Sequence, residues 1–274
     1  IAAQQEFFPH RAREWFKGTP VKFRLDDQVP FGACHHQKVV VIDDRVAFCG
    51  GGDIVTNRWD TPAHLQVDPR RILPHHAAYP PRHEVMMLVD GEAAAALGEL
   101  FRARWRNAAQ AEPAPVAAAE AADPWPPSAP VSLRGVEVAI ARTEPRWKGR
   151  PLVDEIRRLT LACIADATGA IYLENQYFTS HLVTEALEAR LAEPDGPEVI
   201  LMVTGRAPSW FDQATMDRAR NPMVRRLRSA DRFGRFRALA PRTSAGQHIL
   251  LHAKVSVFDD RIVFGQSAAF GGPA

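Results

Sequence analysis

Two stretches of the sequence carry a histidine, a lysine two residues later and an aspartate five residues after the lysine. These residues are His36, Lys38 and Asp43 in the first stretch and His252, Lys254 and Asp259 in the second. Both stretches read as strands, and residues i and i+2 of a strand point to the same face, so each pair presents an imidazole beside an ammonium group. An imidazole attacks phosphorus or moves a proton near neutral pH, and an ammonium group neutralises phosphate oxygens. Two such pairs around one phosphate therefore suit phosphoryl transfer.

The two stretches belong to an internal repeat. Residues 36–51 align without gaps on residues 252–267, and eight of the sixteen positions are identical. The copies lie 216 residues apart, which is far too long a period for a solenoid. A single histidine or lysine on a strand is usually a surface residue, whereas a duplicated pair favours a function. We therefore expect two related lobes that share one active site at their interface.

Other segments predict the elements that would hold these pairs. Residues 90–107 predict a helix with Leu97 and Phe101 on one apolar stripe, and a second helix is predicted after Pro151, which would stand in its first turn. Short apolar runs bounded by turn residues predict strands within 169–178 and 197–205, with a helix between them. This βαβ pattern predicts an α/β fold, with mainly parallel sheets flanked by helices.

One segment of the chain has no apolar face that could pack on a core, and it divides the chain in two. Residues 110–130 are dense in proline and alanine and show no apolar periodicity, so we expect a linker. It would join a first lobe, residues 1–109, to a second lobe, residues 131–274. The few residues before the first motif and after the second predict that both lobes are incomplete, as in a fragment of a larger protein or a shortened variant.

The amino-acid composition limits which classes of function are plausible. The chain has 274 residues, 46% of them hydrophobic, and a net charge of only +2, so no strong positive field favours a nucleic-acid partner. The three cysteines and ten histidines show no metal-ligand spacing, and we expect free thiols and no metal. No stretch reaches about 18 apolar residues and no signal peptide is recognisable. The sequence predicts a cytoplasmic protein, peripheral to the membrane if it meets lipid.

The doubled His-x-Lys-x4-Asp motif resembles that of the phospholipase D superfamily, whose members build one active site from two such motifs. The segments 50–64, 81–94 and 171–178 are similar to the branch that acts on phosphatidylcholine. The resemblance implies a phosphodiesterase that needs no cofactor or metal and works through a covalent phosphohistidine. A phospholipid at a membrane surface would be the substrate, and water or an alcohol would be the acceptor.

The resemblance also implies roles for particular residues. His36 would be the nucleophile and His252 the general acid and then base, although the symmetry of the repeat alone does not decide between them. Glu84 would hold the far ring nitrogen of His36. The lysines would bind phosphate oxygens, while the motif aspartates would brace the turns that follow the strands. Four further residues are expected to shape the substrate side of the site: Gly51, Trp59, Asn175 and Ser267.

The second copy departs from the family pattern of Gly-Ser-x-Asn. Gln266 stands where the glycine is expected and would crowd the pocket, and Ala269 lacks the amide donor of the asparagine. Alternatives therefore stay open beside phospholipid hydrolysis or transphosphatidylation. They are phosphatidyl transfer of the cardiolipin synthase type, a nuclease of the same superfamily, and a non-catalytic remnant that binds phosphate or lipid.

Overall fold

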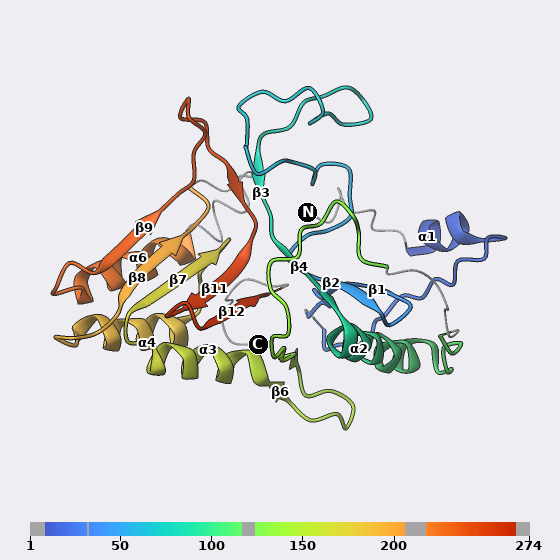
Figure 1. Ribbon diagram of the computed structural model, residues 1–274. Helices are drawn as coiled ribbons and strands as arrows, with labels where there is room; N and C mark the ends of the chain where they lie inside the picture. The colour runs from blue at the N-terminus through green and yellow to red at the C-terminus, as the bar shows by residue number, and fades with distance from the viewer. Residues whose placement is uncertain (1–8, 32, 117–123, 206–217, 267–274) are drawn as a thin grey trace.

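The computed structural model describes residues 9–31, 33–116, 124–205 and 218–266, which form a mixed α/β structure built on two main sheets (Figure 1). Its helices are α1 (Pro9–Phe16), α2 (Gly91–Ala109), α3 (Glu155–Asp166), α4 (His181–Ala192) and α6 (Arg218–Ala230). Its strands are β1 (Lys38–Ile42), β2 (Val46–Gly50), β3 (Arg82–His83), β4 (Met86–Asp90), β5 (Thr143–Glu144), β6 (Val153–Asp154), β7 (Ala170–Asn175), β8 (Glu198–Met202), β9 (Phe236–Leu239), β10 (Leu250–Leu251), β11 (Lys254–Phe258) and β12 (Ile262–Gly265).

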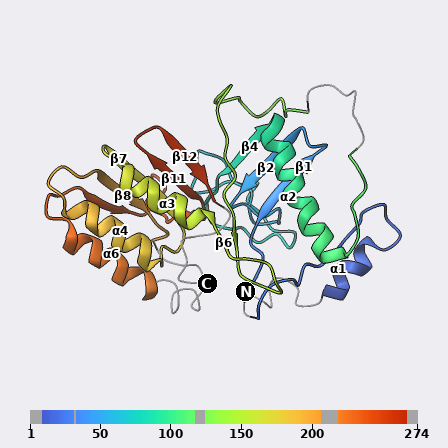
Figure 2. The same ribbon diagram turned by 90° about the horizontal axis from the view of Figure 1, so that it is seen from below.

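The first sheet has the order β1-β2-β4, and both of its pairings are antiparallel. The expectation of mainly parallel strands is wrong here, because β1 returns directly through a tight turn into β2 with no crossover helix. Helix α2 packs on this sheet, as Figures 1 and 2 show. Leu97 on the helix joins Ala47 on the sheet in a small core. Phe101, expected on the same stripe, is 52% exposed because this narrow sheet covers only part of the helix.

The second sheet has the order β12-β11-β7-β8-β9. Its central and outer pairings β7–β8 and β8–β9 are parallel, and the two pairings made by β11 are antiparallel. The predicted βαβ unit is confirmed as β7, α4 and β8. Helices α3, α4 and α6 lie together below this sheet (Figures 1 and 2), over a core that includes Leu173, Leu187 and Leu201.

The helix expected after Pro151 begins later than the sequence suggests. It starts at Glu155, because Val153 and Asp154 first pair with residues 143 and 144 as the β5–β6 ribbon. Leu152 is consequently 54% exposed. Cys163 is buried in the core, as the helical spacing predicts.

Two features connect the parts of the chain that carry the two sheets. Strands β3 and β10 pair in parallel, with Arg82 opposite Leu250 and His83 opposite Leu251. In Figure 1 β3 lies in the upper middle of the molecule, above β4. Ile140, after the proline-rich segment, packs against the first sheet's core, and Arg150 donates to the Gln28 carbonyl. The pairing of β3 with β10 brings the residues next to the second motif beside a strand that follows the first.

The two motif strands end in the same tight turn. Asp43 and Asp44, like Asp259 and Asp260, have positive φ values between 51° and 56°, as in the two-residue turns that favour aspartate. The Asp259 carboxylate accepts hydrogen bonds from three successive backbone N–H groups of residues 168–170, at 2.7 to 2.8 Å. These bonds lower the pKa of Asp259 to about 2. The aspartate therefore ties the turn to the start of β7.

Replacement of Asp259 by alanine is expected to lower the melting temperature by several degrees, because it leaves those three N–H groups without their acceptor. Thermal unfolding monitored by circular dichroism at pH 7 checks this. Asp259→Asn, which retains an acceptor oxygen, should lose less. Equal melting temperatures for the wild type and the alanine variant would contradict the bracing role.

Candidate active site

The two histidine-lysine pairs lie at the starts of equivalent strands. Lys38 opens β1 and Lys254 opens β11, and each histidine precedes its lysine by two residues. Lys38 Nζ lies 3.1 Å from His36 Nδ1, so the imidazole and the ammonium group of the first copy stand together as the spacing predicts. The second copy is deeper, since His252 is buried and Lys254 is only 2% exposed. The first histidine is exposed and borders a cavity of about 560 Å³ beside α2.

Backbone contacts bring the second motif against the glycines that follow the first. The His252 N–H donates to the His83 carbonyl at 2.9 Å, which continues the β3–β10 pairing. A methyl group added to Gly51 would lie 2.8 Å from Glu84 Oε1 and 3.2 Å from both the His252 carbonyl and Lys254 Cδ. Gly51 thus has no side chain because the second motif occupies that space. Two segments 200 residues apart in sequence share one junction.

Glu84 binds His252, which corrects the expectation that it holds His36. Glu84 Oε2 lies 2.6 Å from Nδ1 of His252. Arg82 donates to the same oxygen, with its two nitrogens at 3.2 and 3.3 Å. The reason is topological: Glu84 follows β3, whose parallel partner β10 leads directly into His252. A hydrogen bond from Nδ1 to this carboxylate leaves Nε2 of His252 free to react.

Burial sets the charge of the second pair. It lowers the pKa of His252 to about 4, with Lys254 and Arg82 contributing and Glu84 opposing. Burial likewise lowers the pKa of Lys254 to about 7, and the charge of Lys38 adds to this effect. Lys254 Nζ donates to the Gln176 side chain at 3.2 Å and to the His252 carbonyl at 2.5 Å. An arriving phosphate anion would offset the repulsion on Lys254 and favour its protonated form.

Asp53 and the arginines around it are site residues that the sequence reasoning missed. Asp53 lies 3.4 Å from Lys38 Nζ and 3.6 Å from Arg58. Burial opposes its ionisation, but the charges of Lys38, Arg58 and His252 outweigh burial and lower its pKa. Since Asp53 responds to a cation of each motif, it lies within electrostatic reach of both. Two features of the sequence could have indicated these residues: the aspartate that ends the "GGGD" run, and the alternation of Arg82 with Glu84.

Four cationic side chains and two carboxylates therefore meet at this junction. The cations are Lys38, Arg58, Arg82 and Lys254, and the carboxylates are Asp53 and Glu84. The excess of positive charge, in a partly buried setting, suits an anion with a single dense charge such as a phosphate diester. Across the described ranges, histidine, cysteine and acidic side chains form no cluster of three suited to a metal ion.

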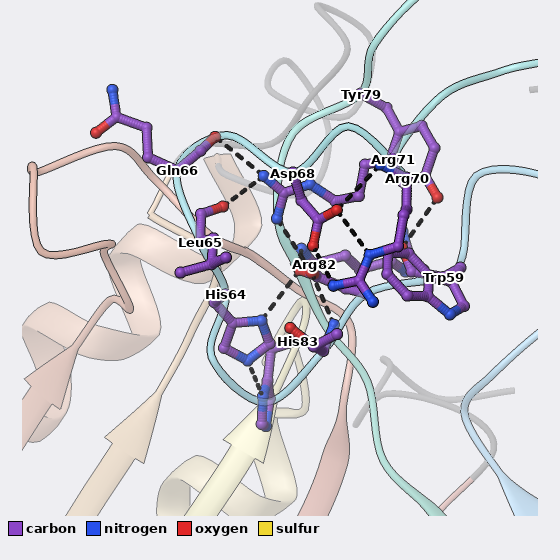
Figure 3. Close-up of polar contacts among 12 residues, drawn as sticks. Trp59, His64, Leu65, Gln66, Asp68, Arg70, Arg71, Tyr79, Arg82 and His83 are labelled. Atoms are coloured by element: carbon purple, nitrogen blue, oxygen red, sulfur yellow. Dashed lines mark hydrogen bonds and ion pairs between the residues drawn. The ribbon is translucent and has the colours of Figure 1, made fainter.

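A chain of polar contacts runs from the loop before β3 into the second sheet. His64 Nδ1 lies 3.1 Å from Asp60, and its Nε2 lies 3.1 Å from Nδ1 of His83 (Figure 3). His83 Nε2 in turn lies 3.1 Å from Glu174 of β7, an ion pair that raises the pKa of His83 above its usual value. Asp60 also accepts from the Arg82 backbone N–H at 2.8 Å. These contacts fix the two residues that precede Glu84.

The remaining predicted residues are distributed unevenly around the junction. Asn175 is buried opposite Lys254 in the sheet, but its side-chain oxygen accepts from the Phe178 N–H, so it shapes the turn after β7. Trp59 is 42% exposed and lies under the Arg70 guanidinium. Figure 3 shows it beside Arg70 and Tyr79.

The three remaining predicted residues are Asp43, Asp259 and Ser267. The motif aspartates Asp43 and Asp259 stand at the far ends of their strands, roughly 16 Å of extended chain from the lysines. They therefore take no direct part at the junction. Ser267 lies outside the residues that the structure describes.

Substitution of Glu84 by glutamine is expected to lower the pKa of His252 further, because the carboxylate is the main group that opposes its fall. The pKa should be followed through the imidazole Cε1 proton in NMR titrations of both proteins. Exposed Glu112 offers a matched control, since Glu112→Gln should leave the His252 titration unchanged. An unchanged His252 pKa in the Glu84 variant would contradict the pairing.

No family model matches the chain. Among curated proteins it is similar to "Phospholipase D1" of Schizosaccharomyces pombe, with 26% identity over 196 residues, and to "Phospholipase D A" of Dictyostelium discoideum, with 27% identity over 184 residues. These alignments cover 55% and 56% of this chain but only 14% of each relative. Across the part of the chain that the structure describes, every helix is too short or too polar to cross a bilayer. The similarities support a phospholipase D-like relationship.

Proposed function

We propose that this chain cleaves the phosphodiester bond of glycerophospholipids and passes the phosphatidyl group to water or to an alcohol. The observation that carries the proposal is the meeting of both motifs at one junction, where Gly51 lies against His252 and Lys254 while Asp53 bridges toward Lys38. The distant similarity to two phospholipases D supports the substrate class.

The reaction would proceed in two displacements at phosphorus. In the first, Nε2 of one imidazole forms a bond to phosphorus, the bond to the headgroup oxygen breaks, and the other imidazole gives that oxygen a proton. In the second, this other imidazole takes a proton from water or an alcohol, whose oxygen bonds to phosphorus as the P–N bond breaks. Lys38 and Lys254 would neutralise the non-bridging oxygens throughout.

We assign the attack to His252 and the proton transfer to His36, which reverses the roles that the resemblance implies. Glu84 holds Nδ1 of His252 and leaves its Nε2 lone pair free. The low pKa keeps this ring neutral at pH 7, as a nucleophile requires. His36 is exposed, so the leaving alcohol and the incoming acceptor can both reach its ring. The P–N bond of phosphohistidine breaks in acid. The trapped intermediate should therefore be digested at alkaline pH and its modified residue identified by mass spectrometry.

Choline release from vesicles of phosphatidylcholine, measured with and without a chelator, tests the function. Turnover that persists in the chelator supports the proposal, and phosphohistidine at position 252 supports the assignment of roles. A label at position 36 would overturn that assignment while leaving the function intact. Binding to the vesicles without turnover would instead identify a non-catalytic lipid-binding protein.

A further inference from the structure

Gln266 occupies a defined place beside the second lysine. Its backbone N–H donates to the Lys254 carbonyl at 2.7 Å, which extends the β11–β12 register by one residue beyond Val255 and Gly265. Gln266 therefore stands opposite Lys254, and cross-strand partners present their side chains on the same face. Asn175 stands opposite Lys254 on its other side. The glutamine thus shares the face on which Lys254 meets Glu84 and the first motif.

The carboxamide of Gln266 is buried without being satisfied. The residue is 7% exposed, and within the described part of the chain its Nε2 atom has no hydrogen-bond partner and no contact with solvent. Buried polar groups in proteins are almost always paired, because an unpaired one keeps the cost of losing water. An amide donor held in this state beside a buried lysine is a site prepared for an acceptor.

The equivalent position of the first copy has no room for a side chain. Gly50 stands opposite Lys38 in the β1–β2 pairing. A methyl group there would lie 2.8 Å from both the Met86 Cα and the Val85 carbonyl, so the third strand of that sheet excludes any side chain. In the second copy β12 is the outermost of the described strands of its sheet. Space thus exists only in the second copy, and a long donor fills it.

We propose that Gln266 binds substrate by donating a hydrogen bond from Nε2 to a non-bridging oxygen of the phosphate held by Lys254. The inference rests on the proposed function and adds to it a phosphate ligand that the first copy lacks. A neutral amide donor suits this place because Lys254, Lys38 and Arg82 already repel one another. A fourth cation would raise that repulsion, whereas an amide supplies a donor without charge. The Gln266 amide would then replace the amide donor that is lost where Ala269 stands in place of the family's asparagine.

The experiment compares Gln266→Met with the wild type in three measurements. Methionine keeps the length of the side chain and removes the donor. We expect the dissociation constant for inorganic phosphate, measured by calorimetry, to rise about tenfold. KM for a short-chain soluble phosphatidylcholine should rise with it. The melting temperature should stay equal or increase, because the variant no longer buries an unpaired amide.

Controls separate the inference from the function on which it rests. Gln66→Met places the same change on an exposed residue and should leave all three measurements unaltered. The side-chain amide resonance that disappears in the Gln266 variant should move when phosphate is added to the wild type. If the wild type turns over and His252→Ala does not, while Gln266→Met binds phosphate as the wild type does, the Gln266 inference fails and the function stands. If the wild type neither binds phosphate nor turns over, both fail.

Discussion

Alanine at position 36 or 252 is expected to lower kcat for phosphatidylcholine at least about 10³-fold. One imidazole forms the bond to phosphorus and the other protonates the leaving oxygen, so neither step has a substitute in the variant. The two losses should not add in the double variant, because both residues act in the same displacement. Choline release in the steady state measures all three proteins.

A matched control is provided by His75, an exposed histidine in the loop before β3. His75→Ala should retain wild-type kcat and KM. Circular dichroism should show that the His36 and His252 variants remain folded, since only then does a lost rate report chemistry. Retention of more than about a tenth of the wild-type kcat in either variant would contradict a mechanism that needs both rings.

Methionine in place of Lys254 is expected to lower kcat/KM about 10²- to 10³-fold and at the same time to stabilise the fold. The ammonium group neutralises a phosphate oxygen in the transition state, and methionine cannot. In the free protein, however, burial and the nearby cations hold the pKa of Lys254 at about 7, so its charged form is costly. The same residue thus serves binding and opposes folding.

The stability effect carries a defined pH dependence. The pKa of Lys254 is about 7 in the folded protein and 10.5 for an unperturbed lysine, so between these values the unfolded chain binds more protons. Wild-type stability should therefore rise with pH through this window, and the advantage of Lys254→Met should be largest below pH 7 and fade toward pH 10.5. At its largest it should be on the order of a few kcal/mol.

Urea unfolding at pH 6.5 and pH 9.5 measures this difference. Lys17→Met is the control, because Lys17 is 77% exposed and its substitution should change neither stability nor activity. A Lys254 variant that is less stable than the wild type at pH 6.5 would show that the buried charge is already compensated in the free protein.

The sequence alone predicts the local structure of the motifs well. The alternation of His36 and Lys38 and the double aspartate predict a strand that ends in a tight turn, and both copies form them. The burial of Cys163 and the βαβ unit follow from short-range periodicity in the same way. Each of these features depends on residues within about twenty positions of one another.

Features that depend on long-range pairing were harder to predict. The resemblance implies His36 as the partner of Glu84, but the β3–β10 pairing places Glu84 against His252. Sheet direction failed for the same reason, since periodicity does not tell which strand lies beside which. Gln266 was read as an obstruction because its register opposite Lys254 and its unpaired amide are visible only in three dimensions.

A crystal structure of the protein with vanadate tests most directly whether the two motifs form one site. Vanadate adopts the five-coordinate geometry of phosphoryl transfer, so it should bind where that transition state is stabilised. One vanadium atom should bond to Nε2 of His252, with His36 on the opposite apical oxygen and both motif lysines on the equatorial oxygens. A vanadate held by one motif only, or separate ions at the two histidines, would contradict the shared site.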